Sequence, residues 1–333
     1  MAHDFESYIP NSILKSKRDQ EFQNFFLSLV DYRNNYFLSN DPEDIIHFYE
    51  GFENREELIE WMKERPKGSS EIREVEGEKE IVVVIPTADL EGEYAKRCRG
   101  EIFKGLHIIF VVSGKGNNYF NYAHNCNVGI NKAMDYNPNW IILSNDDMYK
   151  IDDINFLKNE LENLDKRNID IVLGDPPDII KIGKPTIIRD IIYFLYNSNV
   201  RNRIRLEKYF IKKLKMKIYF TASGTFIDKL LYNNIYEFYS MGVVYGSMTI
   251  LNFRIAKNYN EVLFDETYIN GYEDIDFYLR LNMEKVSKGY TKFKVGAIGG
   301  ASLGKNGSVR TMRDIANLIY FNCKFEKLWK RFK

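Results

Sequence analysis

The chain has little cysteine: only Cys98, Cys126 and Cys323 occur among its 333 residues, and they lie far apart. This odd, widely spaced set excludes a disulfide framework and a paired-cysteine metal site. His124 and Cys126 form one ligand-like pair, but no second pair follows, so a small buried thiol is the better interpretation. The scarcity of cysteine favours a reducing, cytoplasmic location.

Net charge is absent as well, because 47 lysines and arginines balance 47 aspartates and glutamates. This balance argues against a protein that binds nucleic acid by neutralising phosphates in bulk. The N-terminal segment lacks the apolar stretch of a secretory signal, and no apolar run reaches the ~18 residues that a membrane span needs. We expect a cytoplasmic protein that contacts a membrane at most peripherally.

Residues 1–80 are expected to form a helical extension that ends in a linker. Asp41 and Pro42 have the pattern of a capped helix, and a second helix is predicted between Asn54 and Pro66. The stretch that follows is polar and shows no apolar periodicity, which is typical of a linker or surface crossing. The main domain is expected to begin directly after it.

From residue 81 on, apolar strands alternate with helical segments. Strands are predicted at 81–86, 107–112, 140–144 and 169–174, and helices near 91–104, 121–136 and 152–167. This alternation predicts an α/β fold with a mostly parallel sheet and helices on both faces. We expect it to span residues 81–305, with a ligand site at the carboxyl ends of the strands.

Residues 187–218 interrupt this alternation and are strongly basic. Between residues 189 and 217, nine basic residues accompany two acidic ones among large apolar side chains. Such a segment suits an anionic membrane surface or an anionic partner, but a helix packed on the sheet by its apolar stripe is the favoured interpretation. The C-terminal segment 306–333 is expected to form a basic amphipathic helix with the same alternatives.

Polar residues follow the first two predicted strands. The first strand ends at Pro86 and exposes Thr87 and Asp89, and Ser113 follows the second. Loops at the carboxyl ends of parallel strands bind nucleotides in many α/β proteins, although such residues also occur there without a function. We treat these four residues as candidates for nucleotide binding.

The helix predicted at 121–136 contains Gly129, with Asn127 before it and Ala133 one turn later. A glycine inside a helix costs about 1 kcal/mol relative to alanine, so it needs a packing or a ligand reason. No glycine cluster follows the first strand, so the fingerprint of dinucleotide binding is absent.

The third predicted strand runs directly into Asn145, Asp146 and Asp147. Adjacent carboxylates at a strand end repel each other unless a cation or a donor-rich ligand lies there. Mg²⁺ or Mn²⁺ with a diphosphate suits such a site, because these cations bind carboxylates and phosphate oxygens. The alternative is a simple turn, with Asp152 capping the next helix.

A second acidic group, Glu273, Asp274 and Asp276, follows a turn at Gly271. A fixed carboxylate can take a proton from a hydroxyl, and Asp274 is our candidate for that general base. The alternative is structural, because acidic residues are favoured in the first turn of a helix and Asp276 has the spacing of an ion pair with Arg280.

In this order the motifs resemble those of the family 2 glycosyltransferases, particularly the rhamnosyltransferase-like branch, over residues 81–305. That family has the GT-A fold, a Rossmann-like, mostly parallel sheet flanked by helices. The matching elements are Pro86 with Thr87, the helix with Asn127, Gly129 and Ala133, the motif Asn145 to Asp147, and the F-D-E and E-D-x-D phrases within residues 263–281. The last match is the most specific.

The resemblance implies an inverting transfer of a sugar from a nucleotide-diphosphate sugar to an acceptor hydroxyl on a glycan, a lipid-linked molecule or a protein. Mn²⁺ or Mg²⁺ on Asp147 and Asp146 would neutralise the leaving diphosphate, and Asp274 would deprotonate the acceptor. The implied donor-binding residues are Pro86, Thr87, Asp89, Ser113, Asn127, Gly129, Asn145, Asp146, Ser223 and Gly224, with Glu273 and Asp276 on the acceptor side.

Two positions depart from the family pattern. Many relatives have Asp after the second strand, where this chain has Ser113 and Gly114, so the nucleotide is not identified. The family often has a histidine, sometimes a metal ligand, before a Gly-Gly-Ala-Ser segment, whereas Ala297 and Ile298 precede Gly299 here. Metal binding is therefore expected to be weaker, or to be completed by water or diphosphate.

Two other functions compete with this interpretation. A nucleotidyltransferase also uses an α/β sheet and acidic metal ligands, but it usually has a basic glycine-rich loop after the first strand, where this chain has the acidic A-D-L-E-G-E-Y. A non-catalytic relative that binds sugar or nucleotide would account for both departures. Turnover of a sugar nucleotide would separate the enzyme from the binding module.

Overall fold

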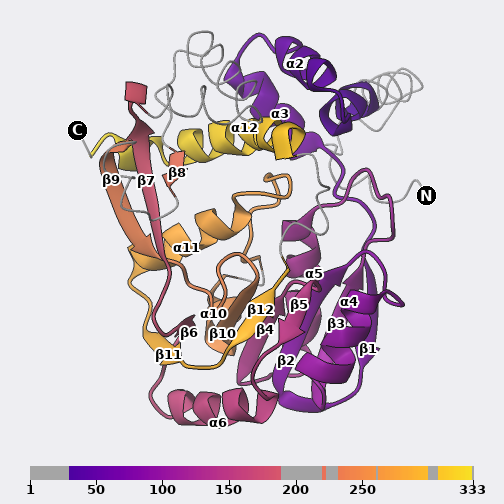
Figure 1. The fold of residues 1–333 in the computed structure, drawn as a ribbon, viewed down its shortest axis with the longest axis vertical. Coiled ribbons are helices and arrows are strands. Elements are labelled where there is room, and N and C mark those ends of the chain that lie inside the picture. Colours follow the sequence, from indigo (N-terminus) through magenta and orange to yellow (C-terminus); the bar gives the residue numbers. More distant parts are fainter. Residues whose placement is uncertain (1–29, 189–219, 223–231, 260–261, 299–306, 332–333) are drawn as a thin grey trace, which may run out of the picture.

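The computed structural model describes residues 30–188, 220–222, 232–259, 262–298 and 307–331 (Figure 1). Its centre is a seven-stranded sheet in the order β1-β3-β2-β4-β10-β6-β11. Its strands are β1 (Glu71–Val75), β2 (Glu78–Thr87), β3 (Leu106–Val112), β4 (Trp140–Ser144), β6 (Ile171–Gly174), β10 (Met248–Asn252) and β11 (Lys288–Thr291). The helices are α2 (Pro42–Glu50), α3 (Arg55–Glu64), α4 (Glu93–Arg97), α5 (Tyr122–Met134), α6 (Ile154–Asp165), α10 (Phe253–Asn258), α11 (Glu273–Glu284), α12 (Gly307–Lys324) and α13 (Glu326–Trp329).

The sheet is mixed but mostly parallel. β2 is parallel to β3 and β4, and β6 is parallel to β11. β10 lies antiparallel between β4 and β6, which therefore share a direction, and β1 is antiparallel to β3. Only β1 and β10 run against the rest of this sheet, so the predicted α/β class is confirmed, while an antiparallel strand in its centre was not predicted.

Helices cover both faces of the sheet, as predicted. Alternate residues of one strand point to opposite faces. Val82 and Val84 of β2 belong to one apolar cluster, which also contains residues of α5. Val83 and Ile85 belong to a second cluster, together with residues of α4 and α6. The predicted strands at 81–86, 107–112, 140–144 and 169–174 are thus the buried centre of the fold.

The N-terminal helices begin where their capping residues predict. The Asp41 side chain accepts a hydrogen bond from the backbone N–H of Glu43, and α2 starts at Pro42. The Asn54 side chain accepts one from Glu57 at the start of α3. These contacts satisfy backbone donors that a helix start leaves without partners.

The linker predicted after Pro66 is wrong over residues 71–75, which form the edge strand β1. Glu71 is paired with Val112 and Val75 with Ile108 of β3. An edge strand that is half-exposed on both sides needs no apolar alternation, which is why the polar pattern concealed it. The sheet therefore begins before residue 81.

Two smaller sheets accompany the central one. β7 (Ile179–Pro185) pairs with β8 (Phe220–Ala222) and β9 (Tyr232–Tyr239) in an antiparallel sheet. β5 (Met148–Lys150) pairs with β12 (Val295–Ala297). The basic segment 187–218 lies almost entirely outside the described residues, because the structure describes only residues 187 and 188 of it.

The C-terminal helix packs against the protein over its described part, 307–331. Phe321 and Trp329 are buried, and the Tyr49 hydroxyl of α2 donates a 2.7 Å hydrogen bond to the Met312 carbonyl of α12. α12 lies alongside α3 at one end of the molecule (Figure 1). Its apolar side is therefore occupied by the protein itself.

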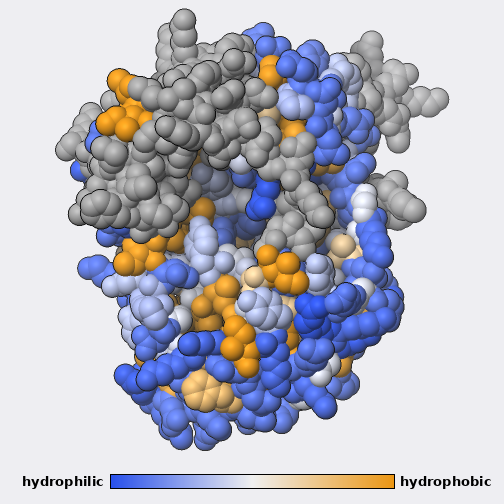
Figure 2. Space-filling model, in the orientation of Figure 1, coloured by the Kyte–Doolittle hydropathy of each residue, from blue (hydrophilic) through white to orange (hydrophobic). Residues whose placement is uncertain are grey.

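A helix that crosses a membrane must be both long and apolar. No helix described here is both long and apolar enough to cross a membrane. Around the lower part of the view in Figure 2, hydrophilic side chains predominate and apolar ones form small separate groups.

Candidate active site

The carboxyl ends of β2 and β4 are joined by a side-chain hydrogen bond. The Thr87 hydroxyl donates to Oδ2 of Asp146 over 2.7 Å, and Thr87 is buried. Since β2 and β4 are parallel neighbours, their carboxyl ends share one edge of the sheet. The nucleotide candidate after the first strand and the acidic motif after the third therefore lie side by side at this edge.

Burial raises the pKa of Asp146, the nearby Asp147 raises it further, and the Thr87 hydrogen bond opposes this rise. The thiol of Cys98, in the π-helical turn Cys98–Ile102 that continues α4, donates to the Asp146 carbonyl over 3.3 Å. Thr87 thus holds the carboxyl group of Asp146 and Cys98 its backbone carbonyl, and the carboxyl group has no cationic partner among the contacts described here.

Asp147 is the more buried member of the pair, with 4% of its surface exposed. Its Oδ1 has no hydrogen-bond partner within the described part of the chain. Its carbonyl accepts a 2.9 Å hydrogen bond from the backbone N–H of Ile298, directly after β12. The segment before Gly299, where the resembling family often carries a histidine, therefore lies beside Asp147.

Asn145 connects the acidic motif to the turn before β10. Its backbone N–H donates to the Ser247 carbonyl over 2.9 Å, and its Nδ2 lies 3.5 Å from the Gly246 carbonyl. A Cβ atom on Gly246, whose φ is +66°, would lie 3.2 Å from Oδ2 of Asp274. Gly246 thus separates Asn145 from Asp274 and brings the second acidic group to the same edge of the sheet.

Asp274 and Glu273 begin α11, which follows a strained turn. Asn270 and Tyr272 have φ values of +53° and +71°, which non-glycine residues rarely adopt. Oδ1 of Asp274 accepts a 2.8 Å hydrogen bond from the N–H of Ile275. Burial raises the pKa of Asp274. This raised pKa brings the carboxylate closer to the range in which a general base is effective.

Glu273 is buried, with 7% of its surface exposed. Its Oε2 has no partner in the described ranges. Burial, followed by the charge of Asp274, raises the pKa of Glu273 to about 8. Glu273 is therefore an uncharged acid at neutral pH.

Asp276 does not lie with these two residues. It is fully buried, accepts a 2.9 Å hydrogen bond from the Tyr268 hydroxyl, and forms ion pairs with Arg280 and with Lys324 of α12. The predicted pair with Arg280 is confirmed. The oxygens of Asp276 hold α11, α12 and the 262–268 loop together, as in the structural alternative for this residue.

Asn127 and Gly129 have structural contacts in α5. Nδ2 of Asn127 donates to the Phe264 carbonyl over 2.9 Å, and the Phe264 N–H donates to its Oδ1 over 3.0 Å. A Cβ on Gly129 would lie 2.2 Å from Val84 Cγ1. Packing of the helix against the sheet is therefore the reason for this glycine, and neither residue reaches the acidic edge through the contacts seen.

The remaining donor candidates surround Thr87. Pro86 is paired with Val111 within the sheet. The N–H of Ser113 donates to the Thr87 carbonyl over 3.0 Å, and Asp89 forms a 2.7 Å ion pair with Lys115. The hydrogen bond from Lys115 lowers the pKa of Asp89. Ser223 and Gly224 lie outside the described residues, as do Gly299 to Ser302.

Three residues of the site were not among the candidates: Lys115, Gly246 and Ile298. Lys115 stands between Gly114 and Gly116, both with positive φ, a pattern that indicates a tight turn. Gly246 reaches the site only through long-range contacts, so no local signal marks it, whereas Ile298 is marked only by the Gly-Gly-Ala-Ser segment that follows it.

No group of three or more His, Cys, Asp or Glu side chains that could hold a metal is found in the described ranges. Asp146 and Asp147 still suit a hard divalent cation, because such cations bind through one or two carboxylates and complete their shell with water and phosphate. The unpartnered Oδ1 of Asp147 and the unpartnered Oδ1 of Asn145 are oxygen ligands of the right kind.

Comparison of the chain with protein-family models and with curated proteins finds no match.

Proposed function

We propose that the chain is an inverting, metal-dependent glycosyltransferase with the GT-A fold, which moves a sugar from a nucleotide-diphosphate sugar to an acceptor hydroxyl. The observation that carries this proposal is the shared edge of the sheet. Thr87, the Asp146–Asp147 pair and Asp274 lie there, with Asn145 and Gly246 between the two acidic groups. The order of the motifs along the chain supports the same assignment.

The acidic pair supplies the cation site in this proposal. Asp147, through its unpartnered Oδ1, and Asp146 would hold Mn²⁺ or Mg²⁺, which when bound neutralises the charge that develops on a leaving diphosphate. Thr87 orients Asp146 by its hydrogen bond. Ile298 offers only its backbone N–H, which is already engaged by the Asp147 carbonyl.

Asp274 is the general base of the proposed reaction. Its carboxylate takes the proton of the acceptor hydroxyl, whose oxygen forms a bond to the anomeric carbon while the bond from that carbon to the diphosphate oxygen breaks. Attack from the side opposite the leaving group inverts the anomeric centre. The raised pKa of Asp274 suits the role, because a base with a pKa near the working pH accepts the proton most effectively.

The donor would lie over the ends of β2, β3 and β4. Thr87, Asp89 and Ser113 border this edge, and the Asp89–Lys115 ion pair bridges the loops after β2 and β3. Lys115 is 77% exposed in its side chain, so a phosphate can take the place of its carboxylate partner without exposing a buried charge.

A thermal-shift panel of UDP, GDP, dTDP and CDP with and without Mn²⁺ tests the donor site, with Asp147→Ala as the variant. A ligand at ~100 times its dissociation constant adds about 2.7 kcal/mol, which moves the midpoint by several degrees. The expected result is a Mn²⁺-dependent shift with one nucleotide that the variant loses. No shift with any nucleotide contradicts the proposal.

Turnover separates the enzyme from a binding module. Sugar-nucleotide hydrolysis or transfer should fall by about 10²-fold or more in Asp274→Asn, since a positioned base contributes roughly that factor. Asp135→Asn, a substitution of an exposed aspartate on the far end of α5, is the matched control and should leave turnover unchanged. Nucleotide binding without turnover in the unsubstituted protein would favour the non-catalytic module.

A further inference from the structure

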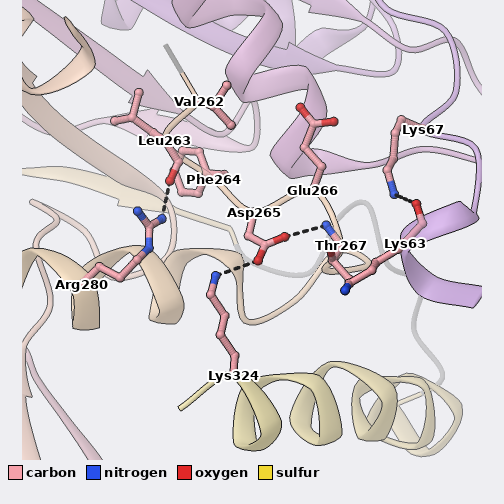
Figure 3. A pocket seen from close by; sticks show the side chains of 10 residues that line it. All are labelled: Lys63, Lys67, Val262, Leu263, Phe264, Asp265, Glu266, Thr267, Arg280 and Lys324. Atoms are coloured by element: carbon pink, nitrogen blue, oxygen red, sulfur yellow. Dashed lines mark hydrogen bonds and ion pairs between the residues drawn. The ribbon is translucent and has the colours of Figure 1, made fainter. Parts of the chain in front are cut away.

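A cavity of about 520 Å³ lies between α3, α11, α12 and the 262–267 loop, away from the acidic edge of the sheet (Figure 3). Its charged lining consists of Lys63, Lys67, Arg280, Lys324, Asp265 and Glu266. Its volume falls within the ~300–1,000 Å³ that is typical of pockets for small ligands. The proposed glycosyl transfer makes no use of it.

This cavity is on a different face of α11 from Asp274. At about 100° per residue, Asp276 and Arg280 are rotated by roughly 200° and 240° from Asp274 around the helix axis. Arg280 lines the cavity, while Asp274 borders Gly246 at the edge of the sheet. The two sites therefore lie on opposite sides of one helix.

The acidic groups of the cavity already have partners. Asp265 accepts hydrogen bonds from Lys324, from the Tyr320 hydroxyl and from the Thr267 N–H. Although burial raises the pKa of Asp265, its ion pair with Lys324 holds this pKa at about 2. Glu266 is hydrogen-bonded to His124 and to Asn127. Neither carboxylate needs a further cation.

Arg280 and Lys324 are likewise engaged. Nε of Arg280 lies 2.7 Å from Asp276, and Nζ of Lys324 lies 2.7 Å from Asp265 and 2.6 Å from Asp276. These two cations and two carboxylates balance one another. They leave Glu266 and the two lysines contributed by α3 and the residues after it to set the charge of the cavity, so positive charge remains in excess.

Lys67 is a buried ammonium group without an acidic partner among the contacts of the described chain. Its Nζ donates only to the carbonyls of Met62 and Lys63, over 3.3 and 3.4 Å, at the end of α3. An ammonium group has three N–H donors, so one remains for a ligand. Burial, together with the like charge of Arg65, lowers the pKa of Lys67 to about 8.

Lys63 contributes a second positive charge to the lining of the same cavity. It is exposed at the rim of the cavity, four residues before Lys67. An anion bound in a cavity that both lysines line is attracted by two positive charges. Two ammonium groups match the charge of a phosphate dianion better than that of a single carboxylate, and lysine binds phosphate as a point charge.

We propose that this cavity binds the phosphate group of a ligand between Lys63 and Lys67, separately from the acidic site. Calorimetric titration with inorganic phosphate, at constant ionic strength and without divalent cations, tests the proposal. Binding should weaken by about tenfold or more in Lys63→Met and in Lys67→Met, as expected for loss of a hydrogen bond from a charged group. The exposed Lys166→Met, at the end of α6, is the control and should bind normally.

The Asp147→Ala variant distinguishes this cavity from the acidic site, because it should keep its full affinity for phosphate. Absence of phosphate binding, or equal binding by all lysine variants, overturns the proposal. Circular dichroism and the melting midpoint in chloride check that each variant folds. If Lys67→Met does not fold, Lys63→Met alone decides.

The number of protons taken up when an anion binds is a further test, because a lysine with a purely structural role would take up none. Sulfate, a tetrahedral dianion that does not titrate near neutrality, should bind near pH 8 with uptake of a proton by Lys67. The groups that set this titration are Lys63 and Arg65 on the α3 side, Asp265 and Glu266 on the loop, and Arg280 and Lys324 on α11 and α12. Titrations in two buffers of different ionisation enthalpy measure the uptake, and its absence overturns the proposal.

The phosphate group can belong to a free small molecule or to a lipid headgroup. Sedimentation with vesicles of phosphatidic acid or of phosphatidylcholine separates the two sources. Pelleting with phosphatidic acid alone, lost in Lys63→Met, assigns the lipid. Binding of inorganic phosphate without pelleting assigns the free ligand.

Discussion

The hydroxyl of Thr87 and the carboxylate of Asp146 lie 2.7 Å apart, although 59 residues separate them in the chain. Parallel pairing of β2 and β4 brings them together, because it aligns the carboxyl ends of the two strands. The hydrogen bond favours the charged form of Asp146, against burial and the neighbouring Asp147, which disfavour it. The proposed cation site would therefore depend on Thr87 through this hydrogen bond.

Replacing Thr87 with valine should weaken binding of a divalent cation. The substitution keeps the shape of the side chain and removes the donor, so the pKa of Asp146 rises further and more of it is protonated. The affinity for Mn²⁺, measured by electron paramagnetic resonance, should fall by roughly tenfold, since one hydrogen bond to a charged group contributes about 1.5–3 kcal/mol. The loss should be greater at pH 6 than at pH 8.

Thr87→Ser keeps the hydroxyl and is the matched control for this experiment. It should bind Mn²⁺ as the unsubstituted protein does. Equal affinities of the valine and serine variants at both pH values would contradict the role assigned to the hydrogen bond.

Introducing histidine at Ile298 should strengthen Mn²⁺ binding. The backbone N–H of Ile298 lies 2.9 Å from the Asp147 carbonyl, and half of the residue's surface is exposed, so the site can accept a larger polar side chain. An imidazole beside two carboxylates adds a nitrogen ligand that Mn²⁺ accepts. We expect the dissociation constant to fall by roughly tenfold, which corresponds to about 1.4 kcal/mol.

Ile298→Asn is the control for this gain, because it removes the apolar side chain without adding an imidazole. An Ile298→His variant that binds Mn²⁺ no better than Ile298→Asn would show that this side chain does not reach the cation. The experiment thus tests whether the proposed cation site lies within reach of residue 298, directly after β12.

Replacing Gly129 with alanine should destabilise the fold. A Cβ there would lie 2.2 Å from Val84 Cγ1 and 2.9 Å from Val111 Cγ2, so α5 or the sheet must shift. Overpacking of this kind costs about 1–3 kcal/mol, which exceeds the ~1 kcal/mol that alanine gains in a helix. Urea denaturation measures the loss.

Gly100→Ala is the control, because a Cβ on Gly100 meets nothing within 4 Å. It should leave the free energy of unfolding unchanged or raise it slightly. A Gly129→Ala protein as stable as the Gly100→Ala protein would contradict the packing explanation. It would favour a ligand as the reason for the glycine at position 129.

The strands and helices of the fold were predictable where burial imposes a pattern. Val82 to Ile85 form an uninterrupted apolar run because both faces of β2 are covered. β1 has no such pattern, because it lies at an edge with polar residues on both sides. The antiparallel position of β10 is fixed by long-range pairing, which no short stretch of sequence records.

Only part of the candidate site could likewise be predicted from the sequence. Asp146 and Asp147 follow a buried strand, so their position at the sheet edge could be inferred. The approach of Asp274 to this edge depends on Gly246, more than a hundred residues after Asn145, and has no local signal. Asp276 is also an aspartate and lies only two residues after Asp274. The turn of the helix directs it to another face of α11, where it forms ion pairs with Arg280 and Lys324.

The buried Glu273 should make the stability of the protein depend on pH between about 4.5 and about 8. Its pKa is about 8 in the folded protein, against an ordinary value of 4.5. Between these values the folded state binds a proton that the unfolded state has released, so the free energy of unfolding falls as pH rises. The loss is on the order of a few kcal/mol across the window and ceases above it.

Glu273→Gln keeps an uncharged side chain of the same shape at every pH, so the free energy of unfolding of this variant should not show the same fall as pH rises. Urea denaturation at pH 5.5 and pH 8.5 measures the difference, and the unsubstituted protein should lose stability relative to the variant on going to the higher pH. Asp265→Asn is the control: its carboxylate, with a pKa of about 2, is charged throughout this range, so its effect on stability should be the same at both pH values. Parallel pH profiles of the unsubstituted protein and Glu273→Gln would contradict the raised pKa of Glu273.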